Sequence, residues 1–204
     1  MIVFGASGHG KVIIEILESI DTPHIEVWDD ATRKPVWQYP VKISQPAGTT
    51  IKDQMIISIG VNATRKKVAE RFANSVSFGS AIHAATCISK RATIGEGTVV
   101  MAGVTVNADT GIGKHCIINT NASIDHDCVL GDYVHISPNA TLSGDVHVGE
   151  GTHIGAGATI IQGIRIGKWC TIGAGAVIIK DIPDHVTAVG NPARIIKIKK
   201  ETEK

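Results

Sequence analysis

A six-residue repeat fills the second half of the chain and restricts its fold more than any other feature. Every sixth residue from Ile82 to Ile178 is Ile, Leu or Val, without an insertion or a deletion. The fifth residue of each hexad, from Thr86 to Ile182, is small or β-branched. A period of six fits neither a helix of 3.6 residues per turn nor an alternating strand. It predicts short strands joined by tight corners, with three strands to a coil, in a solenoid with one continuous core.

The repeat also explains why the chain contains 22 glycines. The second position is glycine in seven hexads, as in Gly95, Gly131, Gly155 and Gly173. Because glycine adopts backbone angles that other residues avoid, we expect these glycines to form the corners. Aromatic residues make up only 4% of the chain, so the core must consist mainly of small and branched aliphatic side chains.

The four cysteines are not spaced as a CxxC motif. We therefore expect reduced thiols rather than disulfides or a metal centre. Cys116, Cys128 and Cys170 all occupy the fifth hexad position, where a small hydrophobic residue is wanted, so we expect them to pack in the core. Cys87 occupies the sixth position and receives no role.

Residues 1–80 have a different pattern, in which strands and helices alternate. The stretch "MIVFGASGHGKVIIEILESI" predicts a strand, a glycine turn and a helix, and "HIEVWDD" and "QMIISIG" predict two more strands. The stretch "VNATRKKVAERFANS" predicts an amphipathic helix with Asn62 as its cap. This alternation indicates a small parallel sheet covered by helices. Ligands bind such sheets at the carboxyl ends of the strands, where residues 5–11, Asp29, Asp30 and Gly60 are expected to converge.

The segment "GASGHGKV" matches neither of the two common phosphate-binding motifs. A Walker A loop would need Ser or Thr where Val12 stands, and the GxGxxG spacing of dinucleotide-binding proteins is absent. What remains is a glycine turn at a helix N-terminus, which exposes backbone N–H groups to an anion. Asp29 and Asp30 are candidates to accept hydrogen bonds from a ribose or a base. A tight structural turn, with acids that merely solvate a strand end, explains the same residues.

Two histidines, His126 and His135, lie nine residues apart, which is half a coil. Both are therefore expected near corners of the solenoid rather than inside it. A neutral imidazole with a pKa near 6.5 can act as a general base, and a carboxylate on its other ring nitrogen fixes the tautomer. Asp125 and Asp127 flank His126, and spacing alone does not choose between them. The alternative is an ordinary surface histidine.

The segments "FGASGHGKV", "WDD", "IGVNATRKK", "INTNASIDHDCVLGDYVHISPNATLSGDV" and "VGNPARIIK" resemble the bacterial sugar acetyltransferases of the NeuD/PglD type. The resemblance implies an α/β, Rossmann-like domain in residues 1–80 that binds a nucleotide-linked sugar. It implies a left-handed parallel β-helix in residues 81–204. It further implies a cytoplasmic homotrimer with acetyl-CoA as co-substrate between neighbouring β-helices, and no metal.

The resemblance also assigns roles to individual residues. His126 matches the catalytic base, Asp127 its acidic partner, and His135 a second histidine beside the acetyl thioester. Asn119 matches a polar residue of the same pocket, and Gly144 matches a glycine whose backbone N–H meets the thioester carbonyl. The residues expected to bind the sugar nucleotide are Ser7, Gly8, His9, Gly10, Lys11, Asp29, Asp30, Gly60 and Asn119. The residues expected to bind acetyl-CoA are His135, Gly144, Ile154, Gly155, Gly173 and Arg194.

The segments "IGAGATI" and "IGAGAVI", which begin at Ile154 and Ile172, are one coil apart, and their small residues would let a pantetheine arm approach the backbone. Regular corners explain the same residues. Arg194, Lys197, Lys199 and Lys200 are candidates for the phosphates of CoA, although a solvated basic tail has the same composition.

The predicted function is therefore acetyl transfer from acetyl-CoA to the 4-amino group of a UDP- or dTDP-linked amino-deoxy sugar, by direct attack. One alternative is O-acetylation of a sialic acid. A second is a zinc carbonic anhydrase, for which His135, His153 and His147 would supply ligands. A third is a sugar-binding scaffold without activity. The net charge of +1 argues against a nucleic-acid face, and no apolar run is long enough to span a membrane.

Overall fold

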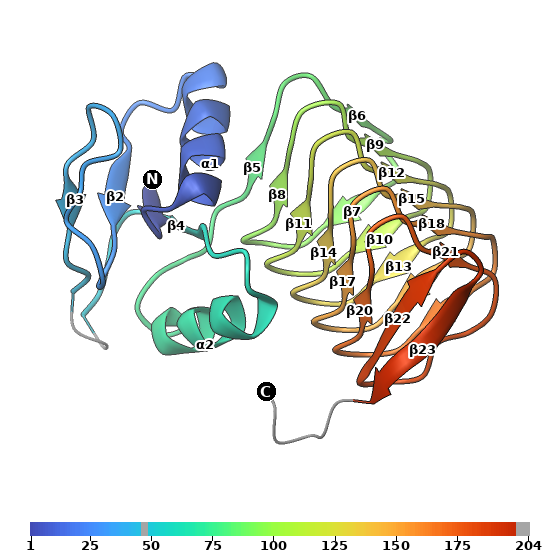
Figure 1. Ribbon diagram of the computed structural model, residues 1–204. Helices are drawn as coiled ribbons and strands as arrows, with labels where there is room; N and C mark the ends of the chain where they lie inside the picture. Colours follow the sequence, from blue (N-terminus) through green and yellow to red (C-terminus); the bar gives the residue numbers. More distant parts are fainter. Residues whose placement is uncertain (46–48, 199–204) are drawn as a thin grey trace.

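The computed structural model describes residues 1–45 and 49–198, and they form an α/β domain followed by a long solenoid (Figure 1). The α/β domain contains a four-stranded parallel sheet in the order β3-β2-β1-β4. Its strands are β1 (Ile2–Phe4), β2 (Glu26–Trp28), β3 (Val41–Lys42) and β4 (Met55–Ile57), and its helices are α1 (Gly8–Ser19) and α2 (Asn62–Phe72).

Helix α1 lies between the sheet and the first coils of the solenoid (Figure 1). Its buried face includes Ile13, Ile14 and Leu17. These side chains belong to a hydrophobic cluster that includes Val3 of the sheet and Val99 of the solenoid. The α/β domain and the solenoid therefore share a hydrophobic core at this point and are not joined by a linker alone.

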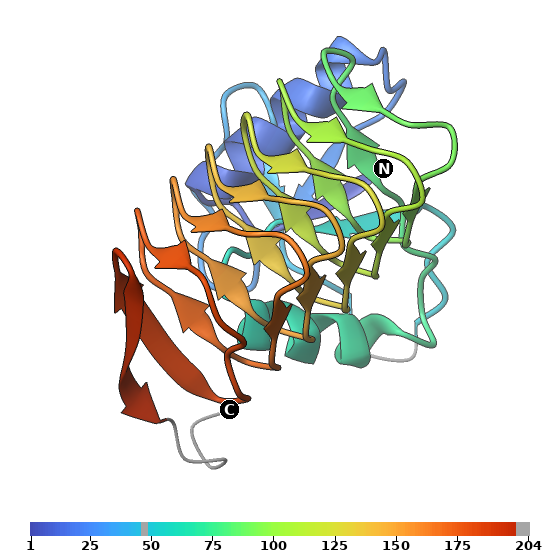
Figure 2. The same cartoon turned by 90° about the vertical axis from the view of Figure 1, so that its right-hand side faces the viewer.

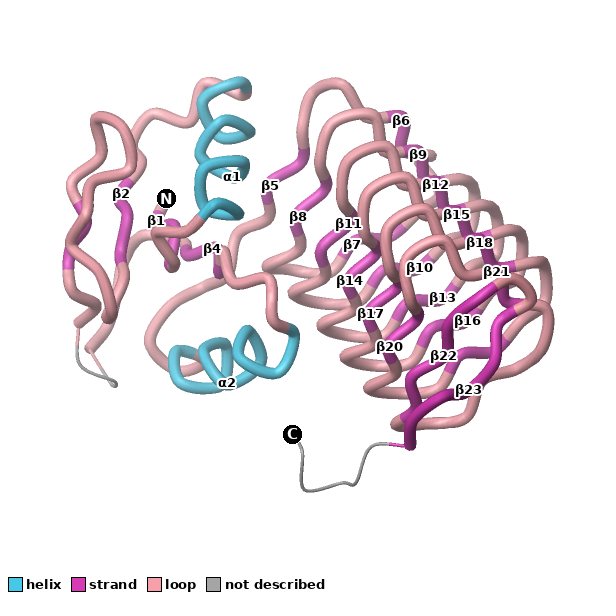
Figure 3. Tube along the Cα trace, in the orientation of Figure 1, coloured by secondary structure: helices cyan, strands magenta, loops and turns pink. Residues whose placement is uncertain are grey.

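The solenoid is built from two-residue strands that return to the same face every 18 residues (Figures 2 and 3). Face 1 contains β5 (Ala81–Ile82), β8 (Val99–Val100), β11 (Ile117–Ile118), β14 (His135–Ile136), β17 (His153–Ile154), β20 (Thr171–Ile172), β22 (Val186–Gly190) and β23 (Ala193–Ile198). Face 2 contains β6 (Cys87–Ile88), β9 (Thr105–Val106), β12 (Ser123–Ile124), β15 (Thr141–Leu142), β18 (Thr159–Ile160) and β21 (Val177–Ile178). Face 3 contains β7 (Thr93–Ile94), β10 (Gly111–Ile112), β13 (Val129–Leu130), β16 (His147–Val148) and β19 (Arg165–Ile166).

The interior of the solenoid is the one that the hexad repeat predicts. The second residue of each short strand is the first hexad residue, and from Val100 to Ile178 all of these side chains are buried. Fifth-position side chains such as Val104 and Ala140 fill the space beside them. Cys116, Cys128 and Cys170 are buried free thiols, as expected, whereas Cys87 is exposed.

The predicted reason for the second-position glycines was wrong. Positive φ angles occur instead at the fourth hexad position, as at Gly97, Asn121 and Asp127. The second-position glycines serve close stacking of the coils, because a Cβ atom on Gly95 would lie 2.6 Å from the backbone carbon of Gly113 in the next coil. Asn and Asp tolerate the left-handed conformation, so polar residues can replace glycine at the fourth position.

Helix α2 is fastened to the corner between faces 3 and 1 of the solenoid. The Arg65 side chain is 1% exposed, and it donates to the backbone oxygens of His115 at 2.8 Å and Tyr133 at 2.9 Å. Asn62 is not the helix cap, since Val61 occupies that position. The Asn62 amide instead donates to the carbonyl of Gly151 at 2.9 Å. A long-range contact therefore engages the Asn62 side chain, which the local sequence had predicted to cap the helix.

Candidate functional site

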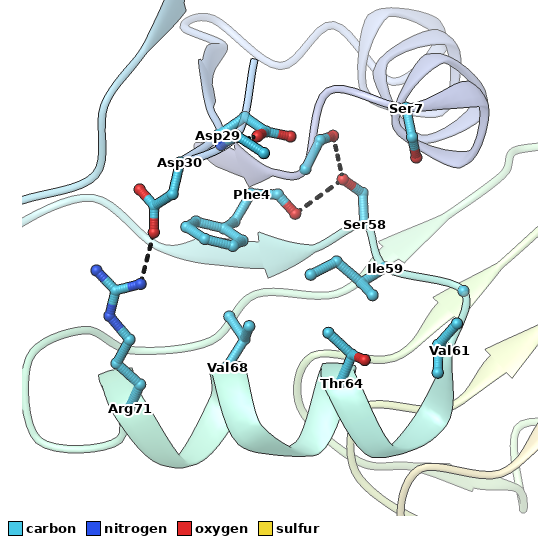
Figure 4. Close-up of a pocket in the computed structure, with 13 residues that line it drawn as sticks. Phe4, Ser7, Asp29, Asp30, Ser58, Ile59, Val61, Thr64, Val68 and Arg71 are labelled. Atoms are coloured by element: carbon cyan, nitrogen blue, oxygen red, sulfur yellow. Dashed lines mark hydrogen bonds and ion pairs between the residues drawn. The ribbon is translucent and has the colours of Figure 1, made fainter.

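The carboxyl ends of β1, β2 and β4 surround a cavity of about 580 Å³ (Figure 4). Of the residues predicted to bind the sugar nucleotide, Ser7, Asp29, Asp30 and Gly60 line it. The remaining lining residues are Phe4, Gly5, Ala31, Ser58, Ile59, Val61, Thr64, Val68 and Arg71. The topology rule for parallel sheets thus located the cavity from the sequence alone.

The two aspartates of the cavity are already bound to the protein. Asp29 accepts backbone N–H bonds from Ala6 at 2.8 Å and Ala31 at 2.7 Å. Asp30 accepts the Ser44 hydroxyl at 2.6 Å and forms an ion pair with Arg71 at 2.6 Å. Burial opposes ionisation of both carboxyl groups, but these bonds outweigh it and lower both pKa values. Both groups are therefore ionised, oriented acceptors at the cavity wall.

Sequence reasoning missed the wall that α2 supplies. Val61, Thr64, Val68 and Arg71 face the cavity from one side of this helix and the residue before it (Figure 4). Their spacing of three, four and three residues marks a single helical face, and that signal was present in the sequence. Arg71 is the one cationic side chain among the described residues that line the cavity, and its guanidinium also lies 4.7 Å from the Phe72 ring centroid.

Five predicted nucleotide-binding residues, Gly8, His9, Gly10, Lys11 and Asn119, do not line this cavity. Gly10 is buried against the carbonyl of Gly5, and a Cβ atom would collide with it. Lys11 and Gly8 are exposed on α1. The His9 Nε2 atom is buried without a hydrogen-bond partner among the described residues. Burial, with a smaller contribution from Arg65, lowers the His9 pKa to about 4.

His126 lies at the corner between faces 2 and 3, after β12, and its side chain is 60% exposed. Its Nδ1 atom is 2.7 Å from the Oδ2 atom of Asp127, which answers the question that spacing left open. The Asp127 backbone is in the left-handed conformation, with φ of 59°, like other fourth-position residues. The hydrogen bond to Asp127 is the main reason why the His126 pKa is raised, and the Asp125 charge adds to it.

The next coil of the solenoid packs against the His126 ring. A Cβ atom on Gly144 would lie 2.6 Å from the His126 Cε1 atom, so the imidazole in this orientation packs directly on the glycine. An open depression of about 470 Å³ surrounds the ring and is lined by Asp125, His126, Ser143, Gly144, Asp145, Gln162 and Gly163. The imidazole is thus oriented by a carboxylate and a neighbouring coil, yet remains accessible.

His135 is on a different face of the same chain. It belongs to β14 on face 1, where its ring stacks on His153 with the ring centroids 4.6 Å apart. Its Nε2 atom is 3.3 Å from the Asn119 amide nitrogen. Burial, and then the His153 charge, lower the His135 pKa to about 3. His135 is therefore more buried than its corner position suggested, and one chain does not bring it together with His126.

The three histidines of the zinc hypothesis do not converge. His153 bonds through Nε2 to the Ser137 hydroxyl at 2.7 Å. His147 bonds through Nε2 to Asp145 at 3.1 Å on face 3. Within residues 1–45 and 49–198, no group of three or more His, Cys, Asp or Glu side chains is arranged to hold a metal ion.

The other predicted acetyl-CoA residues lie towards the carboxyl end of the solenoid. The Ile154 side chain is buried in the core, so only its backbone is available to a ligand. A Cβ atom on Gly155 would lie 2.6 Å from the Ala174 nitrogen, and one on Gly173 would lie 2.7 Å from Val189, so both glycines serve close stacking. Arg194 is exposed on β23, whereas Lys199 and Lys200 lie outside the described residues.

Two family models match the chain. Residues 1–72 match the PglD N-terminal domain, and residues 109–144 and 145–180 match the bacterial transferase hexapeptide model. Perosamine N-acetyltransferase from Caulobacter crescentus, in complex with CoA and GDP-perosamine, is 36% identical, with 96% of each chain covered and a TM-score of 0.89. The chain belongs to the PglD-type sugar acetyltransferases.

Two further proteins that are similar to this chain are also acetyltransferases. The acetyltransferase domain of PglB from Neisseria gonorrhoeae, in complex with acetyl coenzyme A, is 38% identical over 96% of this chain and 98% of that one, with a TM-score of 0.89. UDP-N-acetylbacillosamine N-acetyltransferase from Bacillus subtilis is 45% identical over 105 residues. That alignment covers 48% of this chain and about half (49%) of the curated relative. No helix in the described part of the chain is both long and apolar enough to cross a bilayer.

Proposed function

We propose that this acetyltransferase transfers an acetyl group from acetyl-CoA to the 4-amino group of a nucleotide-linked amino sugar, with His126 as the general base. The observation that carries the proposal is the exposed His126 imidazole, whose Nδ1 atom is held 2.7 Å from Asp127. Because Nδ1 is engaged, Nε2 is the nitrogen that takes the proton from the attacking amine. Asp127 then stabilises the imidazolium that forms.

The reaction proceeds by direct attack. The amine nitrogen bonds to the thioester carbonyl carbon as its proton passes to His126, and the carbonyl oxygen becomes an oxyanion. The resemblance assigns the Gly144 backbone N–H to that oxyanion, and the glycine lies directly beneath the imidazole. Collapse of the intermediate expels the CoA thiolate. The three core cysteines are buried and burial raises the pKa of Cys116 to about 12, so a covalent acyl-thiol intermediate has no support among them.

The nucleotide is proposed to occupy the cavity of about 580 Å³ in the α/β domain. Asp29 and Asp30 are oriented acceptors for a ribose or base, and Arg71 supplies a positive charge. The relatives widen the set of candidate nucleotides beyond UDP and dTDP, since one of them binds GDP-perosamine. Both co-substrates are cytoplasmic metabolites, so we expect the enzyme to act there.

The complete site is proposed to form between chains of a homotrimer. His126 at the corner of faces 2 and 3 and His135 on face 1 are separated within one chain. A site that uses both therefore needs a second chain. Light scattering of the purified protein tests this, and a mass of one chain would contradict it.

The decisive experiment is a panel of UDP-, dTDP- and GDP-linked 4-amino sugars and free sialic acid, each incubated with acetyl-CoA. The expected result is one N-acetylated nucleotide sugar, identified by a product mass increase and by release of the CoA thiol. O-acetylation of sialic acid alone would replace the proposal with the alternative reaction. No thiol release with any acceptor would contradict the proposed function.

A further inference from the structure

A buried threonine lies directly behind the turn that carries His126. Thr110 occupies the fifth hexad position one coil earlier and is 1% exposed. Its hydroxyl donates to the Asp125 carbonyl oxygen at 2.7 Å and accepts the Cys128 N–H at 3.3 Å. The Asp125 carbonyl belongs to the peptide that enters His126, so Thr110 fixes the plane of that peptide from inside the core.

The N–H end of the same peptide is fixed from outside. His126 N–H donates to Asp125 Oδ1 at 2.8 Å, and the same oxygen accepts the Asn107 amide at 2.7 Å. The Asp127 N–H donates to the Ala108 carbonyl at 3.0 Å. The backbone of the His126 turn is therefore held by the preceding coil on both sides, which sets the direction of its Cβ atom.

A similar contact supports the corresponding turn one coil later. Cys128 stands one coil after Thr110, and its thiol donates to the Ser143 carbonyl oxygen at 3.2 Å. That carbonyl belongs to the peptide that enters Gly144, the residue on which the imidazole ring packs. Thr110 and Cys128 thus anchor the peptides that enter His126 and Gly144, at the same corner of two successive coils.

We propose that Thr110 is a positioning residue for acetyl transfer, acting through the peptide that enters His126, with Cys128 doing the same for Gly144. The inference rests on the proposed function, because it assigns His126 to the reaction. Thr110 is buried, so it contacts neither substrate. It acts by keeping the imidazole in line with Asp127 and above Gly144, and a displacement of about 1 Å in such geometry can cost 10²-fold in rate.

The chain offers two matched controls for this proposal. Thr98 hydroxyl donates to the Gly113 carbonyl at 2.9 Å and accepts the Cys116 N–H at 2.9 Å. Thr152 makes the same pair of bonds, donating to Gly167 at 2.7 Å and accepting from Cys170 at 2.9 Å. Both are buried fifth-position threonines at the corner between faces 3 and 1 rather than at the His126 corner.

The test compares Thr110→Val, Thr98→Val and Thr152→Val. Each removes the same hydroxyl at nearly constant volume, so we expect similar losses of thermal stability. Only Thr110→Val should lower kcat, by roughly 10-fold or more, with both KM values changed by less than about threefold. Thr110→Cys should restore most of the rate, since the chain itself uses cysteine as the donor at this position in the next coil.

A titration of the histidine Cε1–H signals by NMR separates this inference from the proposed function. We expect Thr110→Val to move the His126 pKa back towards 6.5, and the two control variants to leave it in place. This result would support the positioning role even if no sugar nucleotide were acetylated. Equal losses of kcat in all three valine variants, or an unchanged His126 titration in Thr110→Val, would overturn it.

Discussion

The α/β domain and the solenoid build binding sites in opposite ways. The domain gathers residues distant in sequence, such as Asp30 and Arg71, around one cavity at the end of a sheet. The solenoid repeats one local unit and varies single corner positions, so Asp127 and Asn121 occupy equivalent places with different side chains. A site in the domain therefore depends on the fold around it, whereas a site on the solenoid depends on which residue a corner carries.

The largest expected effect belongs to the solenoid corner. His126→Ala should lower kcat by roughly 10²–10⁴-fold, the usual contribution of a general base. Circular dichroism should show an unchanged fold, because the His126 side chain is 60% exposed. His24→Ala, at another exposed histidine, serves as the control. A rate for His126→Ala within twofold of the original enzyme would remove His126 from the mechanism.

The second prediction breaks the connection between the two regions. Arg65→Met should lower the free energy of unfolding by about 3 kcal/mol, since it leaves buried backbone oxygens of His115 and Tyr133 without a donor. Urea denaturation measures the loss. Lys67→Met, on the exposed side of the same helix, should change the free energy by less than about 0.5 kcal/mol. Similar values for both variants would refute the role given to Arg65.

The third prediction concerns pH at the corner. Base catalysis requires neutral His126, and its hydrogen bond to Asp127 raises its pKa, so the rate should rise with pH through a pKa above 6.5. Asp127→Asn removes the charge and lowers that pKa. The acid limb of kcat/KM should therefore move to lower pH, and kcat at neutral pH should fall by about tenfold. An acid limb that stays in place would show that another group titrates.

The smallest effect is expected in the domain cavity. Arg71→Met should raise the KM for the sugar nucleotide by about fivefold, because Arg71 is the cation of the cavity wall and is partly exposed. The KM for acetyl-CoA should not change. Lys11→Met is the control, since Lys11 lies outside the cavity. A change in the KM for acetyl-CoA alone would mean that the nucleotide does not bind in this cavity.

The repeat predicted the solenoid because each hexad depends only on its neighbours. The first- and fifth-position residues are buried as expected, and the three fifth-position cysteines are in the core. Local spacing did not reveal that Asp127 rather than Asp125 reaches the ring, because Asp125 is engaged by the His126 N–H and by the Asn107 amide of the preceding coil.

Two further errors concern Asn62 and His135. Asn62 was expected to cap a helix, but a carbonyl 89 positions further along the chain takes its amide. His135 was expected near a corner, but it lies within a strand, where its ring packs against His153 and is half-buried. The Asn62 contact leaves no local pattern, so it could not be predicted from the sequence, whereas the neighbourhood of His135 and His153 follows from the 18-residue coil.

The coil length of the solenoid limits how such a chain can change in length. Removal of 18 residues ahead of the His126 corner would slide the base along the axis by one strand spacing, about 4.8 Å, and leave it on the same edge. Removal of six residues would instead rotate every later corner by a third of a turn and carry the imidazole away from its edge. Insertions and deletions in this solenoid should therefore come in whole coils, which lets evolution adjust the distance between the cavity of the α/β domain and His126 in fixed steps.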